Sequence, residues 1–325
     1  MSIITTVVGS YPTRSYEAES FNDKITKSLG LFDPYKQSII NSVKAFVEAD
    51  IDIICDGQVR EDMVKIFASK INGFRIEDNT TFINGKITPA PHPISVKDFK
   101  IAFKIAHSLN SQFKLNAPLE DIFNHEAKGV KGILTGPTTL IHSSMIENFY
   151  SSRENAIYDI AKALLVEAKE LEKAGACAIQ IDEPFISTGV EDINVSRTGV
   201  EIISEELDIP VILHVCGDLK DVLPDLLKFD VDILDFEFSG MPQNIGALKK
   251  AWSSNINKYI GIGCVNTRLE EVDKIEDVRN TVCNVKDIIK SDKLIIDPDC
   301  GMRTLTTDLS EGKLDLLKTI KGEDI

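Results

Sequence analysis

The chain has 325 residues, of which 43% are hydrophobic and 27% charged, which is enough to build a sizeable core. Its formal net charge of −15 argues against nucleic acid and anionic membranes as partners, because both bind to basic surfaces. The N-terminal stretch MSIITTVVGSYP lacks the basic segment and long apolar core of a signal peptide, and no run approaches the ~18 apolar residues of a membrane span. We therefore expect a cytoplasmic protein that binds small molecules or another protein.

Short β-branched segments alternate with longer amphipathic ones along the chain, which is typical of β-α units around a parallel sheet. The candidate strands are TTVVGSYP, DIDIICDG, KGILTGP, CAIQIDEP, IPVILHVCGD, VDILDFEFSG, KYIGIGCVN and KLIIDPDCG. A closed parallel barrel needs this number of strands, and its active site lies at their carboxyl ends, where polar residues gather in this sequence. The pattern favours a (β/α)8 barrel, or TIM barrel, over an open sheet, and no GxGxxG or P-loop motif supports a nucleotide-binding fold.

The stretch between the second and third strands contains TTFINGKITP, and its Asn84-Gly85 pair is typical of a hairpin turn. We interpret residues 66–130, approximately, as a hairpin-containing insertion on one catalytic barrel domain that spans residues 1–325. Downstream, apolar residues recur at helical spacing in ENAIYDIAKALLVEAKELEKAGA. This spacing predicts a long helix that ends at Gly175, since glycine suits the C-terminal cap.

His214 and Cys216 end the apolar strand IPVILHV. Because one residue separates them, both side chains point to the same side of the strand and can reach one metal ion. They are equally well explained as a buried histidine beside a small buried cysteine, since cysteine is among the most buried residue types. The pair alone therefore leaves both interpretations open.

Two later strand ends favour the metal. Glu237 lies in the apolar run VDILDFEF, where a buried carboxylate needs a cation or a hydrogen-bond donor; a salt bridge would also satisfy it. Cys300 follows the last strand in DPDCG, where a buried structural thiol is the alternative. Together with His214 and Cys216 these residues form a set of N, S and O donors from three strand ends, which suits Zn(II) best.

The remaining cysteines fit a metal site less well. Cys55 and Cys177 lie within or at the start of strands, and Cys283 lies in the helical stretch DVRNTVCNVKDIIK, so we assign all three to packing. Cys264 is also near a strand end and is expected close to the pocket rather than on the metal. Cysteines scattered in this way are typical of reduced thiols in a cytosolic protein.

The motifs GSYP, GQVREDMV, LTGPTTL, IQIDEP, HVCG and DPDCGMRT, in this order over about residues 4–305, resemble the catalytic C-terminal barrel of cobalamin-independent methionine synthase. The chain looks like a short, single-barrel form of that family. The resemblance implies a zinc-dependent methyltransferase that methylates the thiol of L-homocysteine to give L-methionine. It assigns the zinc to His214, Cys216, Glu237 and Cys300.

The resemblance also implies which residues hold the substrate. Gly9, Ser10 and Asp182 match the residues that bind homocysteine in the family, with Asp182 pairing with the ammonium group. Gln58 stands where the family has a glutamate, so a hydrogen bond replaces an ion pair there. Two thiolates and one carboxylate on a divalent cation sum to a net charge of −1, which keeps a bound substrate thiolate nucleophilic and suits alkyl transfer better than water activation.

The methyl donor is expected to differ from that of the long enzymes. The stretch LTGPTTLIHSSM has no tryptophan to stack on a folate, and GCVNTRLEE has no histidine to protonate the leaving group. These departures lead us to expect a methylated corrinoid as donor, such as methylcobalamin on a partner protein. Two other hypotheses stay open: a related zinc barrel that methylates another thiol, and a zinc-binding barrel without catalysis.

Overall fold

The computed structural model describes residues 2–323, and its centre is a seven-stranded parallel sheet with the order β1-β12-β11-β10-β9-β8-β6. Its strands are β1 (Ser2–Thr5), β6 (Gly132–Thr135), β8 (Ile179–Asp182), β9 (Val211–Val215), β10 (Ile233–Glu237), β11 (Tyr259–Val265) and β12 (Lys293–Pro298). All five residues of β9 and of β10 are buried. This is expected of parallel strands that are covered on both faces.

A two-stranded parallel sheet lies beside the main one and consists of β2 (Ile53–Ile54) and β5 (Gly129–Val130). A parallel bridge between Thr6 and Ile53 connects it to the continuation of β1. The pairing of β2 with β5 continues past β5, where the amide of Lys131, the residue between β5 and β6, donates to the Ile54 carbonyl at 2.8 Å. The fold is therefore an α/β structure with a mostly parallel central sheet.

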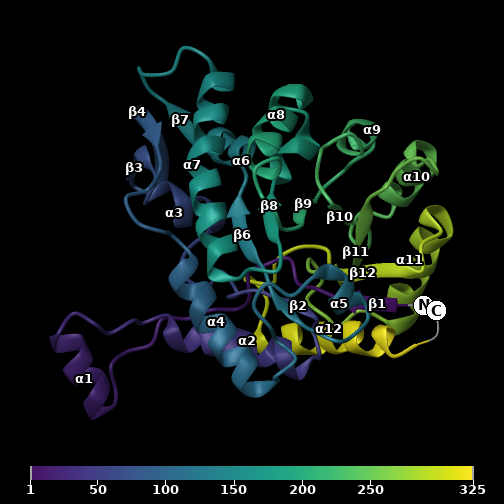
Figure 1. Ribbon diagram of the computed structural model, residues 1–325, viewed down its shortest axis with the longest axis horizontal. Coiled ribbons are helices and arrows are strands. Elements are labelled where there is room, and N and C mark those ends of the chain that lie inside the picture. The colour runs from purple at the N-terminus through teal and green to yellow at the C-terminus, as the bar shows by residue number, and fades with distance from the viewer. Residues whose placement is uncertain (1, 324–325) are drawn as a thin grey trace.

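Helices pack along the strands (Figure 1). They are α2 (Lys36–Glu48), α3 (Met63–Ala68), α4 (Val96–Leu109), α5 (Leu119–Phe123), α6 (Pro137–His142), α7 (Arg153–Ala174), α8 (Ile193–Ser204), α9 (Leu223–Leu226), α10 (Gln243–Ala251), α11 (Ile275–Ile289) and α12 (Thr307–Lys321), with a 3-10 turn at Pro184–Thr188. The predicted helix is confirmed as α7: Ser152 caps its first turn, and Gly175 ends it with a φ of 101°. Its apolar face is buried against the core.

Each of the predicted strands corresponds to a strand of the structure. The bounds of the first strand and the position of the hairpin turn differ from the prediction. The first strand is Ser2–Thr5 and lies upstream of most of TTVVGSYP; the residues after it lead toward the carboxyl ends of the neighbouring strands. The predicted turn at Asn84-Gly85 is wrong, because both residues lie within β4 (Thr80–Thr88). The hairpin turns at Asp78 and Asn79, whose φ angles of 45° and 65° suit a two-residue turn after β3 (Asn72–Glu77).

The hairpin strand β4 also pairs with β7 (Ser144–Ile146), so this small sheet has three strands. A separate short helix, α1 (Phe21–Ser28), stands away from the body in Figure 1 and has no buried residue. Ser20 and Asp23 form a capping box at its start. Within the described residues, no helix is both long and apolar enough to cross a membrane.

Candidate active site

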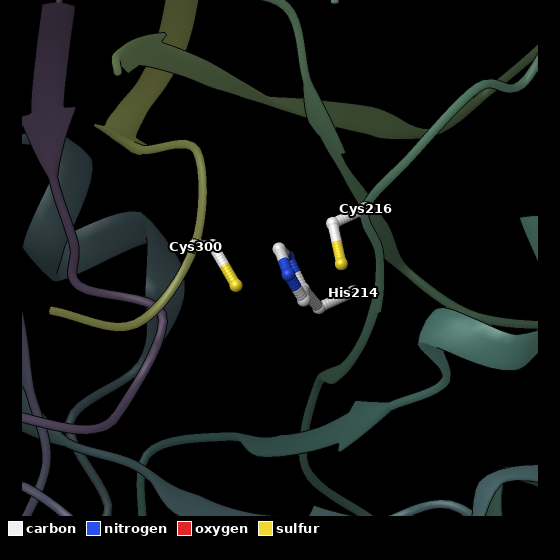
Figure 2. Close-up of side chains that lie close together, drawn as sticks. All are labelled: His214, Cys216 and Cys300. Carbon is white, nitrogen blue, oxygen red and sulfur yellow. The ribbon is translucent and has the colours of Figure 1, made fainter. Parts of the chain in front are cut away.

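The carboxyl ends of β9 and β12 bring together three of the four predicted metal ligands (Figure 2). His214 is the next-to-last residue of β9, Cys216 directly follows that strand, and Cys300 follows β12. One ligand atom from each of these residues lies within 4.8 Å of the others. Figure 2 shows the two sulfur atoms on either side of the imidazole ring.

The His214 ring is oriented by Asp235 on the neighbouring strand β10. The two residues are partners in the strand register, and His214 Nδ1 lies 2.7 Å from Asp235 Oδ2. Burial lowers the pKa of His214, but the charge and hydrogen bond of Asp235, together with the nearby Cys216 and Cys300, outweigh it, so the pKa lies well above its usual value. A carboxylate on one ring nitrogen is the usual outer partner of a metal-binding histidine, because it fixes the tautomer that leaves the other nitrogen for the metal.

The polar atoms of this cluster fit a cation. His214 Nε2 is buried without a hydrogen-bond partner. The hydrogen bond from Cys216 holds the pKa of Cys300 well below its usual range, and the same proximity raises the pKa of Cys216 well above its own. A cation bound between the two sulfurs would stabilise both as thiolates.

Glu237, the fourth predicted ligand, lies at the end of β10 and is 1% exposed. Its Oε2 accepts from the Gly217 amide at 2.8 Å and from Arg268 Nη2 at 2.9 Å, whereas its Oε1 is buried without a partner. Burial raises its pKa. The structure does not include Glu237 in the compact cluster of His214, Cys216 and Cys300, so its free oxygen is the observation that keeps it a candidate ligand.

The predicted substrate residues share a cavity with the cluster. A cavity of about 270 Å³ is lined by Ser10, Gln58 and Asp182, together with His214 and the two clustered cysteines. Gly9 does not line it, but it lies so close to the Gln58 side chain that a Cβ on Gly9 would meet Gln58 Oε1 at 2.5 Å. A larger cavity of about 410 Å³ next to it shares Gln58 but none of the clustered residues.

Two glycines allow the strand ends to approach one another. Gly217 has a φ of 97°, which favours glycine, and its amide reaches Glu237 in that conformation. Gly301, directly after Cys300, lies against the Ser10 hydroxyl, and a Cβ there would clash with Ser10 Oγ. The Met302 amide also donates to the Ser10 carbonyl at 2.7 Å. These contacts hold the segment after β1 against the segment after β12.

Several buried residues around the site were not predicted from the sequence. Asp235 was missed although it alternates with Glu237 and therefore faces the same side of β10. Asp299 accepts from the backbone amides of Phe238, Ser239 and Gly240 and thereby fixes the loop after Glu237; burial raises its pKa to about 8. The aspartate-rich sequence DPDCG was the available signal for Asp299.

The interior below the cluster is also polar. Asp297 is fully buried, neither of its carboxyl oxygens has a partner, and burial together with nearby Asp235 raises its pKa well above the usual value. Lys131 and Gln180 lie in the same interior and are buried as well. Cys264, expected close to the pocket, is fully buried and donates to the Asp297 carbonyl, but it does not line the cavity.

Fold and site together define an α/β enzyme with a thiol-rich cluster in a cavity at the carboxyl ends of its strands. Residues 3–321 match the family described as "Cobalamin-independent synthase, Catalytic domain". The chain therefore belongs to the cobalamin-independent methionine synthase family, and it is a methyltransferase.

Similar proteins of known name agree with this assignment. The chain is 44% identical to a methionine synthase of Methanothermobacter thermautotrophicus, covering 96% of this chain and 97% of that one. It is 40% identical to a methionine synthase of Methanocaldococcus jannaschii, covering 96% of each. Its fold is similar to a B12-independent methionine synthase from Shewanella solved with selenomethionine, with a TM-score of 0.77, 23% identity, and coverage of 99% of this chain and 97% of that one.

These findings overturn the predicted corrinoid donor, and with it the expected methylcobalamin and corrinoid partner protein. The family to which the chain belongs is described as cobalamin-independent. The prediction was wrong because it inferred a donor from a missing tryptophan and a missing histidine, and the absence of two side chains does not identify what binds in their place. The hypothesis of a barrel without catalysis is also wrong, since the family is one of enzymes.

Proposed function

We propose that this methyltransferase methylates the thiol of L-homocysteine to give L-methionine, using a zinc ion held by His214, Cys216, Glu237 and Cys300 and a methyl donor other than cobalamin. The observation that carries the proposal is a buried imidazole nitrogen without a partner beside two thiols, in a cavity lined by a buried carboxylate. Zinc in such a set supplies a Lewis acid that allows a substrate thiol to ionise near neutral pH. The names of the relatives support homocysteine as the thiol.

The protein's own residues bind and orient the substrate in this proposal. Asp182 is 4% exposed, and burial raises its pKa to about 6, while His214, Gln180 and Lys131 act in the opposite direction. An ionised Asp182 pairs with the substrate ammonium, and the Ser10 hydroxyl and the Gln58 amide offer hydrogen bonds to the rest of the amino-acid end. Gly9 leaves the space in which the Gln58 side chain lies.

We further propose that the chain is one catalytic domain over residues 1–325, with residues 66–130, approximately, inserted after β2, and that its strands close into an eight-stranded barrel. The bridge from Thr6 to Ile53 and the hydrogen bond from Lys131 N to Ile54 O support closure through β2. We also propose a cytoplasmic location, since the site requires reduced thiols. All six cysteines are free.

X-ray absorption at the zinc edge tests the proposal directly. Zinc-loaded protein should show two sulfur neighbours without substrate and three after homocysteine is added, because the substrate thiolate joins Cys216 and Cys300. Asp182→Asn should weaken homocysteine binding in calorimetry by about tenfold, since a charged hydrogen bond is lost. A sulfur count that stays at two, or a chain that binds no zinc, would refute the proposal. A third sulfur from thiols in general, without preference for homocysteine, would favour a related enzyme that acts on another thiol.

A further inference from the structure

Lys131 is a buried cation that the proposed chemistry does not use. It lies between β5 and β6 and is 2% exposed. Its Nζ donates to Thr6 Oγ1 at 2.9 Å and to Gln180 Oε1. Within the described part of the chain, no carboxylate forms a salt bridge with it. Its hydrogen bonds go only to neutral groups, although its charge lowers the pKa of nearby Asp182. A buried ammonium without a directly bonded counter-ion is costly.

The ammonium determines which way the Gln180 amide points. Because a lysine side chain can only donate, the oxygen of the amide must face it. Both hydrogens of Gln180 Nε2 are then directed away from Lys131, and they are donated to the Val8 carbonyl and to Asp182 Oδ1, each at 2.6 Å. The opposite orientation of the amide would place two donors against each other and leave these two acceptors without a partner.

Both acceptors belong to the proposed substrate site. Val8 directly precedes Gly9 and Ser10, so its carbonyl fixes the segment that carries the Ser10 hydroxyl. Asp182 has one oxygen occupied by Gln180, which sets the rotation of the carboxylate and leaves Oδ2 for a ligand in the cavity. One lysine, acting through one glutamine, thus holds two segments that are far apart in the sequence.

We propose that Lys131 is a positioning residue, which acts through Gln180 to hold Asp182 and the segment Val8–Ser10 in the arrangement that recognises the ammonium group of the thiol substrate. The inference rests on the proposed function, because it assumes that Asp182 takes that ammonium. Lys131 itself does not touch the substrate. Its loss should therefore reduce recognition of the amino-acid end and leave the metal and the binding of the sulfur unchanged.

The test compares two thiols on zinc-loaded protein by calorimetry: homocysteine, and 4-mercaptobutyrate, which lacks the amino group. Lys131→Met should weaken homocysteine binding by about tenfold or more, the usual effect of a lost charged hydrogen bond. Binding of 4-mercaptobutyrate and the zinc content from elemental analysis should stay within about twofold of wild type. Lys128→Met is the matched control: Lys128 is also buried, but it pairs with Asp50 away from the cavity.

The outcomes separate this inference from the proposed function. A wild-type protein that binds both thiols equally refutes ammonium recognition by Asp182, and Lys131 loses its role with it. A wild type that prefers homocysteine, together with a Lys131→Met variant that keeps the full preference, overturns only the role of Lys131. Lys128→Met should preserve the preference for homocysteine over 4-mercaptobutyrate. If it reduced that preference as much as Lys131→Met does, the effect would be a general one of removing a buried lysine, and the inference would be overturned.

A second variant covers the case in which Lys131→Met does not fold. Gln180→Glu keeps an acceptor for Lys131 but removes both donors to Val8 and Asp182. It should retain zinc and lose the preference for homocysteine over 4-mercaptobutyrate by about tenfold. A Gln180→Glu protein with the wild-type preference would show that neither donor positions the site.

Discussion

At the amino ends of β2 and β5, Asp52 has a partner for both of its carboxyl oxygens, whereas at the carboxyl ends of the strands Glu237 has a partner for only one. Asp52 Oδ2 accepts from the Thr5 amide at 2.9 Å, and its Oδ1 lies 2.7 Å from Lys321 Nζ and 3.2 Å from Lys128 Nζ. Among the described residues, most of the buried side-chain polar atoms without partners lie instead around the cluster, in His214, Asp235, Glu237 and Asp297, and the others are the hydroxyls of Tyr11, Thr138 and Ser204.

This difference separates two uses of buried charge. A buried polar group without a partner costs about 1–3 kcal/mol. Several such groups in one place therefore indicate a site where a ligand supplies the missing partners. Paired charges at the opposite end leave nothing for a ligand and contribute to the stability of the fold. Substitutions at the two ends should therefore change different measured quantities.

The largest effect is expected from removing a ligand. Cys300→Ser should lower zinc affinity roughly 10²–10³-fold, because four ligands share about 10–16 kcal/mol of binding free energy in comparable sites. Competition with a chromophoric chelator measures it. Cys283→Ser, a substitution in α11 away from the cavity, should bind zinc as wild type does. Equal affinity in both variants would mean that Cys300 does not hold the metal.

At the other end, Asp52→Asn should lower the free energy of unfolding by about 3 kcal/mol, since it removes the buried one of the two carboxylates that pair with Lys128 and Lys321 and leaves only the half-exposed Asp50. Urea denaturation of the metal-free protein measures this. Zinc affinity should be unchanged, because Asp52 lies away from the cavity. A variant that keeps its stability and loses zinc would erase the distinction between the two ends.

Most of the strand segments, the helix α7 and the three clustered residues at the strand ends could be predicted from the sequence, because each depends on local periodicity or on the position of a residue at a strand end. His214, Cys216 and Cys300 are brought together by the parallel alignment of strands, which the eight-strand pattern implies. The hairpin turn was mistaken because Asp78-Asn79 and Asn84-Gly85 are both acceptable turn sequences, and only the pairing of β3 with β4 decides between them.

The contacts of Lys131, Gln180 and Asp235 could not be predicted from the sequence. Each looks, in the sequence, like an ordinary polar residue in or beside a strand, and its role depends on a partner from another strand: Gln180 for Lys131, His214 for Asp235. Alternation gives the side of the strand to which a residue points, but not which residue it meets across the sheet. The methyl donor could not be predicted either, because the sequence does not show which residues contact it.

A smaller effect is expected at Asp235. Asp235→Asn should lower zinc affinity about 10–100-fold, the usual cost of losing the outer partner of a metal-binding histidine. Asparagine keeps the shape but not the charge that holds the His214 tautomer. The chelator competition used for Cys300 measures it. Zinc affinity that stays at the wild-type value would place Asp235 with the structural charges.

The smallest effect is expected at Asp50, and its size should depend on pH. Burial raises its pKa, but hydrogen bonds and charges of Lys128 and Lys321 outweigh burial, so the pKa lies below the usual 3.8. A lowered folded-state pKa contributes stability above pH 3.8 that disappears as the pH falls through the folded-state value. Asp50→Asn should cost about 1 kcal/mol or less at pH 7, because the side chain is half exposed and water screens its ion pairs.

The difference between Asp50→Asn and wild type in urea denaturation should therefore close as the pH is lowered past 3.8. The matched substitution Asp287→Asn, on α11, should leave the free energy of unfolding equal to that of wild type both at pH 7 and below pH 3.8. If the difference in free energy of unfolding between Asp50→Asn and wild type persisted in acid, the Asp50 oxygens would act as hydrogen-bond acceptors whatever their charge. The amino ends of the strands would then be stabilised by geometry rather than by paired charges, and the contrast with the carboxyl ends would rest on hydrogen-bond partners alone.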